Sequence, residues 1–299
     1  RHLFGVDDEH YLSSINAAEG LSEISTEETG SKSGQKFLIT GDGRYFMKTI
    51  TKSECKFFRS ILPQYYQHMR DCKNTLLCRF FGLHRIKPGR MHLLVMTNMF
   101  DTERIIHERY DLKGSTLGRA VTEAEKKNPT VILKDLDFLQ SNNKLVLGVE
   151  RKQTLLAQLQ TDTRFLETIG VMDYSLLLGV HWRDRTHSAK PTTETQKKRA
   201  RDGLLRVGSL MQRRREQTHT SEFQQDDGGW CSLATEDGVH VSGKEIYFLG
   251  IIDYLQFYNT RKRAETFVKS CKYKTETISA VPPGLYARRF CAFMASIIE

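Results

Sequence analysis

The sequence predicts an α+β fold in two lobes, with an antiparallel sheet in each lobe. Three observations predict this fold class. The first hundred residues contain four short strand-like runs around one helical run, and tight turns join neighbouring runs. An amphipathic helical run then precedes two long apolar runs, which are typical of buried strands. The chain of 299 residues, of which 39% are hydrophobic, is long enough to build one large or two smaller packed domains.

The first lobe is predicted to span residues 1–99 and to begin with a short helical segment at 3–15. The turn Gly41-Asp42-Gly43 predicts a β-hairpin, because Asp-Gly between apolar runs is a strong hairpin signal. The capping box Thr51-Lys52-Ser53-Glu54 starts a helix that Pro63 ends or kinks. The strands expected in this lobe are 36–40, 44–50, 78–86 and 91–96.

The second lobe is predicted to span residues 100–299. A strand with a turn at 129–138 and apolar strands at 169–180 and 245–254 are expected, together with helices at 150–168 and 285–299. Residues 184–242 are polar, basic and poor in apolar side chains. Such a segment cannot bury enough apolar surface to fold by itself, so it is predicted to be a disordered insert.

The most distinctive stretch is 109–119, Arg-Tyr-Asp-Leu-Lys-Gly-Ser-Thr-Leu-Gly-Arg. A strand that ends in Lys113-Gly114-Ser115-Thr116 presents backbone N–H groups, hydroxyls and a cation. These groups suit a phosphate, because charged donors bind it strongly and glycine lets the backbone approach closely. The alternative for each residue taken alone is a surface hairpin with solvated charges.

Three further charged residues are singled out by their positions next to apolar strands or glycine turns. Asp173 lies at the head of one apolar strand and Asp253 at the end of another, and an isolated acid there is costly unless it is used or well bonded. A turn aspartate that bonds to the backbone is the alternative for Asp173. Lys48 lies on the strand that follows a glycine-bearing turn, and its alternative is an exposed strand lysine.

The net charge of +9 is uneven along the chain. Residues 1–30 carry seven acids against one arginine, whereas residues 183–215 carry eleven Lys and Arg against three acids. The basic segment indicates contact with an anionic partner, either a membrane or a nucleic acid. Base stacking would need interleaved aromatics, and Trp182 is the one aromatic close by, so no nucleic-acid partner is expected.

Composition excludes several other classes of protein. No apolar run approaches the roughly 20 residues of a membrane span, and no signal peptide is recognised. The six cysteines form no Cys-x-x-Cys pair, which argues against a zinc site and for a reducing compartment. The chain starts at Arg1 rather than at Met, so we expect it to be a piece of a longer one.

The order of elements in the first lobe resembles the small lobe of the protein-kinase superfamily. The whole chain except residues 183–242 resembles the phosphatidylinositol phosphate kinases. This resemblance rests on three motifs, Asp111-Leu112-Lys113-Gly114-Ser115-Thr116, Met172-Asp173-Tyr174-Ser175-Leu176-Leu177 and Ile251-Ile252-Asp253-Tyr254. It implies a two-lobed protein-kinase-like fold, with ATP and Mg²⁺ as cofactors and phosphoryl transfer as the reaction.

The resemblance also implies a role for individual residues. Asp253 would bind Mg²⁺, Asp173 would orient or deprotonate the attacking hydroxyl, and Lys113 would neutralise charge near the transferred phosphoryl group. The residues assigned to ATP are Gly30, Ser33, Gly34, Lys48, Asn98, Met99 and Phe100. The residues assigned to the lipid headgroup are Arg119, Lys262, Arg263 and Glu265.

Substrate choice is assigned by the resemblance to a loop at 254–283, which also senses the membrane. Glu265 and the run Leu133-Lys134-Asp135-Leu136-Asp137 favour a 5-kinase that acts on phosphatidylinositol 4-phosphate. A 4-kinase that acts on the 5-phosphate lipid, a 5-kinase that acts on the 3-phosphate lipid and a catalytically inactive phosphoinositide-binding scaffold remain the alternatives. The expected partner is phosphatidylinositol monophosphate in an anionic membrane. The protein is expected to bind peripherally to the cytoplasmic face of membranes, above all the plasma membrane. A homodimer is a further expectation.

Overall fold

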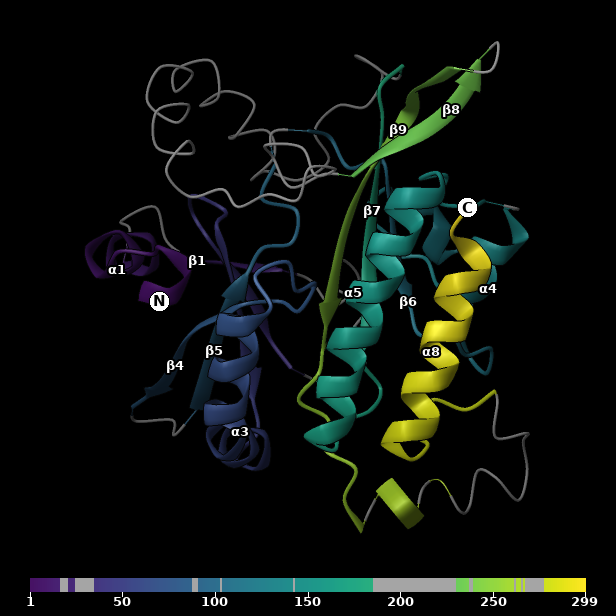
Figure 1. The fold of residues 1–299 in the computed structure, drawn as a ribbon. Coiled ribbons are helices and arrows are strands. Elements are labelled where there is room, and N and C mark those ends of the chain that lie inside the picture. The colour runs from purple at the N-terminus through teal and green to yellow at the C-terminus, as the bar shows by residue number, and fades with distance from the viewer. Residues whose placement is uncertain are drawn as a thin grey trace.

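The computed structural model shows an α+β protein with two antiparallel sheets, and the first sheet with helix α3 lies beside the second sheet with helices α5 and α8 (Figure 1). The residues described are 1–16, 21–24, 35–87, 91–102, 104–141, 143–184, 230–236, 239–260, 262–264, 266 and 277–299, with the backbone alone for 230–236 and 239–242. The predicted α+β class is confirmed.

The first sheet has the strand order β1-β2-β3-β5-β4, and each neighbouring pair is antiparallel. Its strands are β1 (Leu21–Ile24), β2 (Phe37–Thr40), β3 (Tyr45–Ile50), β4 (Phe80–Ile86) and β5 (Met91–Thr97). The last four are the four predicted strands. The predicted hairpin forms between β2 and β3, where Gly43 has a φ of 69° and its N–H donates to the carbonyl of Thr40. Strand β1 was not predicted, since its four residues are too few to display a period.

Helix α3 (Lys52–Asp71) begins at the predicted capping box, in which Thr51 and Glu54 exchange hydrogen bonds. The prediction that Pro63 could end the helix was wrong, because Pro63 lies inside one continuous helix. The helix packs its apolar face on the first sheet, which compensates for the hydrogen bond that proline cannot donate.

The predicted helical segment at 3–15 is divided into two pieces. A 3-10 turn, η1 (His2–Phe4), ends at Gly5, whose φ of 64° is left-handed. Helix α1 (Asp8–Asn16) follows it. The glycine therefore allows the chain to turn between the two pieces.

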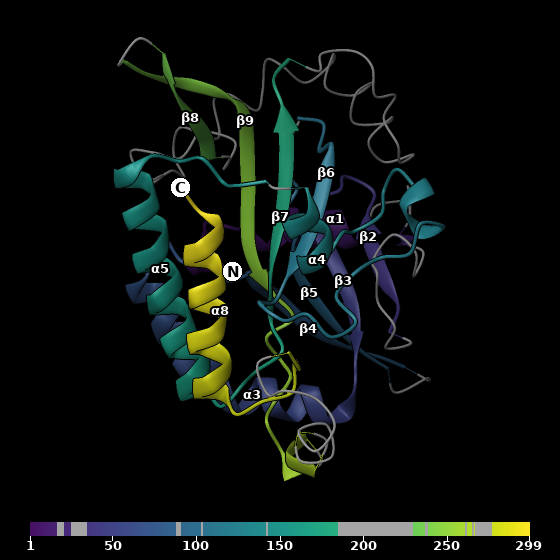
Figure 2. The same ribbon diagram turned by 90° about the vertical axis from the view of Figure 1, so that its right-hand side faces the viewer.

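The second sheet has the order β6-β7-β9-β8 and is also antiparallel. Its strands are β6 (Glu108–Leu112), β7 (Ser175–Trp182), β8 (Trp230–Glu236) and β9 (Val239–Ile252). The helical segments of this half are η2 (Glu125–Lys127), α4 (Asp135–Gln140), α5 (Val149–Thr168) and α8 (Pro283–Ile297). Helices α5 and α8 lie side by side and cover one face of the sheet (Figure 2).

Two predictions for the second half were wrong. Residues 129–138 do not form a strand: Leu133 makes an isolated parallel bridge to Tyr110, and helix α4 begins at Asp135. The end of the predicted disordered insert is ordered, because residues 230–236 and 239–242 belong to β8 and β9. Residues 185–229 of the predicted insert lie outside the described residues.

One hydrophobic core contains residues from both sides of the predicted boundary at 99 and 100. The connection is made by Leu77, which bridges Ile251 of β9, and by Tyr254, whose hydroxyl donates to the carbonyl of Cys78. The end of β9 is thereby held against the first half of the chain. Asp253, next to this contact, is placed close to the first sheet.

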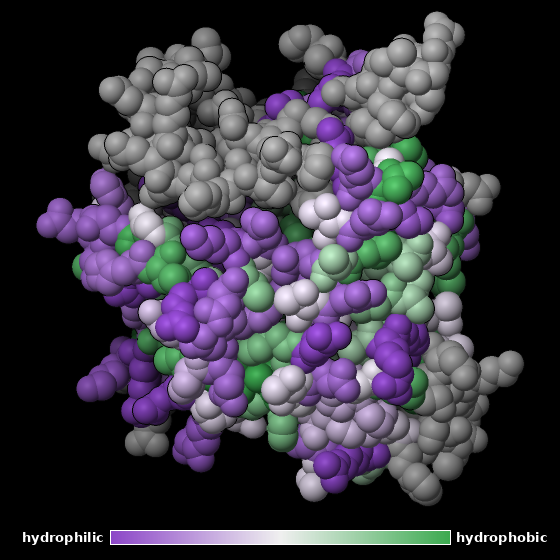
Figure 3. Space-filling model, viewed as in Figure 1, coloured by the Kyte–Doolittle hydropathy of each residue, from purple (hydrophilic) through white to green (hydrophobic). Residues whose placement is uncertain are grey.

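None of the described helices is both long and apolar enough to cross a membrane. The face drawn in Figure 3 is mostly hydrophilic, with apolar residues in small groups between polar ones. The large apolar side chains instead line the interior, for example Leu112, Tyr174 and Phe290, which are fully buried.

Candidate active site

Three of the predicted site residues lie at one end of the second sheet, where strands β6, β7 and β9 start or finish. Lys113 follows the last residue of β6, Asp173 comes two residues before β7, and Asp253 follows the last residue of β9. The register pairs Leu112 with Leu176 and Ser175 with Ile252, so these three strand ends are neighbours. Antiparallel pairing thus brings together residues that are 140 positions apart in the chain.

The turns that carry the two acids are bonded to each other. The N–H of Met172 donates to the carbonyl of Gln256, and the N–H of Tyr258 donates to the carbonyl of Gly170, at 3.1 Å each. These bonds fix the backbone just before Asp173 and just after Asp253.

Lys113 and Asp173 form the first ion pair of the site. The Lys113 Nζ atom donates to the Asp173 carboxylate at 2.9 Å and to the Asp173 carbonyl at 2.7 Å. Burial lowers the pKa of Lys113, but the carboxylates of Asp173 and Asp111 outweigh it and hold that pKa above its ordinary value. The amine therefore stays charged.

Lys48 and Asp253 form the second ion pair, and it joins the two sheets. Lys48 lies on β3, and its Nζ atom is 2.5 Å from a carboxylate oxygen of Asp253. The lysine side chain is 12% exposed and the aspartate side chain 42% exposed, so the pair opens to solvent on the side of the acid. The Glu54 carboxylate on helix α3 accepts hydrogen bonds from the Thr51 N–H and the Gln35 amide, and it is not the ion-pair partner of Lys48.

Arg119 lies between two carboxylates. Its Nε atom donates to Asp135 at 2.6 Å, and its Nη2 atom donates to the carboxylate of Asp111 at 2.5 Å. Asp111 accepts a further bond from Ser175. Burial raises the pKa of Asp111, but Lys113, Arg119 and these hydrogen bonds hold it below its ordinary range.

The described charges of the site nearly balance. Its three cations are Lys48, Lys113 and Arg119, and its four carboxylates are Asp111, Asp135, Asp173 and Asp253. The Arg289 guanidinium also interacts electrostatically with Asp135 and Asp173, so the described part of the site carries little net charge.

The residues predicted to frame a nucleotide base connect the two sheets. The amide of Asn98 donates to the Gly43 carbonyl and accepts from the Phe100 N–H. Met99 covers Gly250 so closely that a Cβ atom there would lie 1.8 Å from its methyl group, and Phe100 packs on Ile106 of a small apolar cluster. The role of residues 98–100 in adenine binding stays a prediction. In the structure, the contacts of this segment are with other residues of the protein.

The remaining predicted residues divide into two groups. Lys262 and Arg263 follow Asn259, which accepts from both of their N–H groups, and Arg263 stands over the Tyr258 ring. Gly30, Ser33, Gly34 and Glu265 lie outside the described residues.

Of the four carboxylates of the site, that of Asp253 is the most exposed, at 42%, and it could hold a magnesium ion. Among the described residues, no group of three or more His, Cys, Asp and Glu side chains is arranged so that it could hold a metal ion. Mg²⁺ does not require such a cluster, because it is commonly held by one or two carboxylates together with substrate phosphates and water. A half-exposed carboxylate beside Lys48 matches that requirement.

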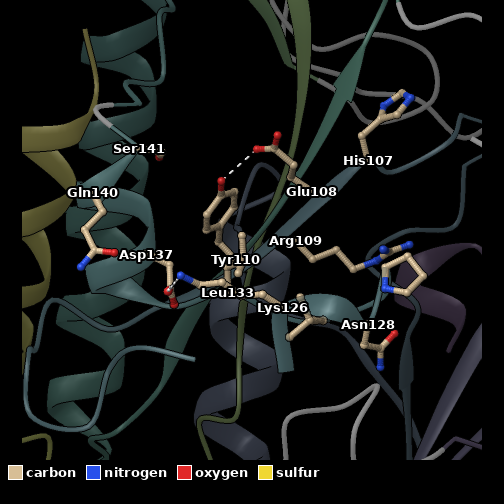
Figure 4. Close-up of a pocket in the computed structure, with 12 residues that line it drawn as sticks. His107, Glu108, Arg109, Tyr110, Lys126, Asn128, Leu133, Asp137, Gln140 and Ser141 are labelled. Carbon is tan, nitrogen blue, oxygen red and sulfur yellow. Dashed lines mark hydrogen bonds and ion pairs between the residues drawn. The ribbon is translucent and has the colours of Figure 1, made fainter. Parts of the chain in front are cut away.

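A separate pocket of about 450 Å³ lies beside strand β6 (Figure 4). Glu108 and Tyr110 of β6 line it, together with Lys126 and with Asp137 of helix α4. Figure 4 shows the hydrogen bond from Tyr110 to Glu108 at its wall. None of Lys48, Lys113, Asp173 and Asp253 lines this pocket, so it is distinct from the site described above.

Sequence reasoning missed two acids of the site. Asp111 belongs to a motif that carried the family resemblance, and Asp135 belongs to the run 133–137 that favoured a 5-kinase, but neither was assigned a function. Asp135 is fully buried, and a buried acid is expected to be bonded to several donors. The signal that could have found it is the pair of acids Asp135 and Asp137 at the start of a helix.

The chain belongs to the family described as phosphatidylinositol-4-phosphate 5-kinase, whose family model matches residues 17–297. Among curated proteins it is similar to a probable phosphatidylinositol phosphate kinase of Dictyostelium discoideum, 36% identical over 339 residues, which cover 100% of this chain and 46% of that protein. The phosphatidylinositol 4-phosphate 5-kinase its3 of Schizosaccharomyces pombe is 34% identical, with coverage of 100% and 44%. The human type-1 beta phosphatidylinositol 4-phosphate 5-kinase is 37% identical, with coverage of 99% and 55%. The chain thus spans about half the length of the curated relatives it matches.

Proposed function

We propose that this protein transfers the γ-phosphoryl group of Mg²⁺-ATP to the 5-hydroxyl of phosphatidylinositol 4-phosphate. The observation that carries the proposal is the convergence of two ion pairs, Lys48 with Asp253 and Lys113 with Asp173, at neighbouring strand ends. Membership of the 5-kinase family and the printed names of its relatives support the choice of substrate.

Each member of the two pairs has a chemical task in phosphoryl transfer, which requires mainly positioning and charge neutralisation. Lys48 would bind phosphates of ATP, and Asp253 would hold Mg²⁺, which supplies further positive charge to the phosphates. Asp173 would accept a hydrogen bond from the attacking hydroxyl and orient it. Lys113, held charged by Asp173 and Asp111, would stabilise negative charge on the transferred group.

We also propose that the two sheets are the two lobes of a protein-kinase-like fold, with the nucleotide between them. The Lys48–Asp253 pair supports this arrangement, because it joins β3 of the first sheet to the end of β9 in the second. A ligand that contacts both residues would contact both sheets. The segment 98–100, which connects them, would frame the base.

The membrane is the proposed site of action, and the loop 254–283 is the proposed contact. Its residues 261–274 contain six Lys and Arg, namely Arg261, Lys262, Arg263, Lys269, Lys272 and Lys274. A cation near an anionic bilayer contributes about 1 kcal/mol. Binding to vesicles with acidic lipids is therefore expected to weaken as salt is raised, and salt-independent binding would contradict an electrostatic contact.

The decisive experiment measures transfer from radiolabelled ATP to vesicles that carry the 3-, 4- or 5-monophosphate of phosphatidylinositol in turn. We expect the 4-phosphate lipid to be the best substrate and a bisphosphate to be the product. Faster turnover of the 5-phosphate lipid would support the 4-kinase alternative. Binding of the lipids without turnover would support the inactive scaffold.

Glu265→Ala tests the predicted determinant of substrate choice. The ratio of turnover on the 4-phosphate lipid to that on the 5-phosphate lipid is expected to fall in this variant. An unchanged ratio would remove Glu265 from specificity while leaving the reaction itself standing.

A further inference from the structure

Asp135, at the start of helix α4, contacts the backbone of Lys113 and the side chain of Arg119. It is fully buried, and one of its carboxylate oxygens accepts from the N–H groups of Lys113, at 2.9 Å, and of Gly114, at 2.7 Å. The other oxygen accepts from Nε of Arg119 at 2.6 Å. One side chain thus fixes the backbone that carries Lys113 and the guanidinium of Arg119.

The position of Asp135 is itself set by the edge of the second sheet. Leu133 pairs with β6, because its N–H donates to the Arg109 carbonyl and its carbonyl accepts from the Asp111 N–H. The chain then turns into helix α4. The N–H of Leu136 donates to the carbonyl of Arg119, which ties the two segments a second time.

Helix α8 packs against the turn at Lys113 and Gly114, on the side opposite Asp135. Gly114 has a φ of 66°, and a Cβ atom there would lie 2.9 Å from Cβ of Phe293 and 3.3 Å from the carbonyl oxygen of Arg289. The turn after β6 is therefore confined between α8 and Asp135. A small displacement of it would move the Lys113 amine, whose contact with Asp173 depends on that backbone.

We propose that Asp135 is a positioning residue, which holds Lys113 and Arg119 in the geometry that phosphoryl transfer requires. Asp135 does not contact the reacting atoms and acts through these two cations. This inference rests on the proposed function of the same site. Misplacement of a reactive group by about 1 Å can reduce turnover on the order of a hundredfold.

Asp137 provides a matched control on the same helix. Its side chain is also buried, and it accepts from the N–H groups of Val121 and Lys134 and lies 3.6 Å from the Lys126 amine. It lines the separate pocket rather than the site (Figure 4). Asp137→Asn therefore perturbs a buried acid of α4 without touching Lys113 or Arg119.

The test compares Asp135→Asn with Asp137→Asn by steady-state kinetics, urea unfolding and hydrogen exchange of the Lys113 and Gly114 amides. In Asp135→Asn the amide NH₂ group faces either the two N–H donors or the arginine, so one set of bonds is lost. We expect kcat to fall on the order of tenfold to a hundredfold, the KM for ATP to stay within about twofold, and the two amides to exchange faster. Asp137→Asn should keep kcat within about threefold and leave the two amides as protected as before.

A kcat of Asp135→Asn near that of the wild type, or an equal loss in both variants at equal loss of unfolding free energy, would overturn the proposal. If Asp135→Asn does not fold, Asp135→Glu keeps the charge but moves the carboxylate by one methylene, and wild-type kcat in that variant would be equally decisive against it. If the wild type phosphorylates no inositol lipid, the proposed function fails. The exchange of the two amides still tests the positioning in that case.

Discussion

Asp173 and Asp253 both have a left-handed backbone, with φ values of 64° and 61°, and among the described residues no other non-glycine residue has a positive φ. They stand at the ends of the neighbouring strands β7 and β9. Such a conformation costs about 1–3 kcal/mol, and it persists only where the surrounding structure enforces it. Backbone strain at two acids, each paired with a lysine from another strand, points to a site under functional constraint.

Asp253→Asn is expected to remove lipid phosphorylation while the protein stays folded. Asparagine has the same shape and also tolerates a left-handed backbone, but it lacks the charge that would hold Mg²⁺. Turnover should fall on the order of 10²- to 10³-fold, as measured with radiolabelled ATP on vesicles that carry phosphatidylinositol 4-phosphate.

The control for this variant is Asp184→Asn, whose carboxylate is 64% exposed and pairs with Lys244 at the other end of the sheet. It should keep wild-type turnover. Equal turnover by the Asp253 and Asp184 variants would remove Asp253 from the metal role.

The variants Gly114→Ala and Gly118→Ala together distinguish two costs of an added Cβ atom, which are steric contact with neighbouring atoms and strain in a left-handed backbone. Both glycines have a positive φ, 66° and 68°, so alanine costs about 1 kcal/mol at either position. At Gly114 the added Cβ atom would also meet Phe293 and the Arg289 carbonyl. At Gly118 no atom of the described residues, apart from the chain neighbours, would lie within 4 Å of it.

We therefore expect Gly114→Ala to lower the unfolding free energy by about 1–3 kcal/mol more than Gly118→Ala does, measured by urea unfolding. Turnover should also fall more in Gly114→Ala, since its turn carries Lys113. Two variants of equal stability and activity would show that helix α8 does not confine this turn.

Asp111→Asn tests the electrostatics of the Arg119 cluster through the pH dependence of stability. The pKa of Asp111 is lower in the folded protein than its ordinary value of about 3.9. Its charged form therefore stabilises the fold above about pH 4, and this contribution is lost as the pH falls through the folded pKa. Breaking a largely buried ion pair costs roughly 3 kcal/mol.

The difference in unfolding free energy between wild type and Asp111→Asn should thus be largest near pH 7 and shrink as the pH falls below about 4. Urea titrations across this range measure it. Glu123→Gln, at a carboxylate that is 87% exposed, is the control and should follow the wild type. A difference that does not change with pH would indicate that the asparagine acts through packing alone.

Asp162→Asn tests the contact between helices α3 and α5. The Asp162 carboxylate is fully buried and lies 2.8 Å from the His68 ring nitrogen on α3, and it accepts from Thr75 and from the Leu76 N–H. An amide would place a donor against at least one of these donors, so the unfolding free energy should fall by about 2–4 kcal/mol.

The neighbouring Thr161→Ala is the control, because the Thr161 side chain is exposed and bonds only within its own helix. It should change the unfolding free energy by less than about 0.5 kcal/mol. A similar loss in both variants would mean that Asp162 contributes no more than a surface residue.

The sequence alone determined the elements whose signals are local. The hairpin between β2 and β3 follows from Asp42-Gly43, and helix α3 starts at its capping box, because turns and caps depend on residues within a few positions. The two acids at strand ends were also recognisable, since a charge beside an apolar run is costly unless it is used. The motifs around Lys113, Asp173 and Asp253 were sufficient to indicate the family.

Only the tertiary structure decided which residues meet. Strand register brings Lys113 to Asp173, and the contact between the sheets gives Lys48 the partner Asp253, over separations that no local pattern encodes. Packing also decided that α3 continues through Pro63 and that Asp135, at the start of a six-residue helix too short to display a period, is buried against Lys113 and Arg119. The physical reason is that burial and pairing are properties of surfaces brought together by the whole chain, whereas propensity acts within one turn or strand.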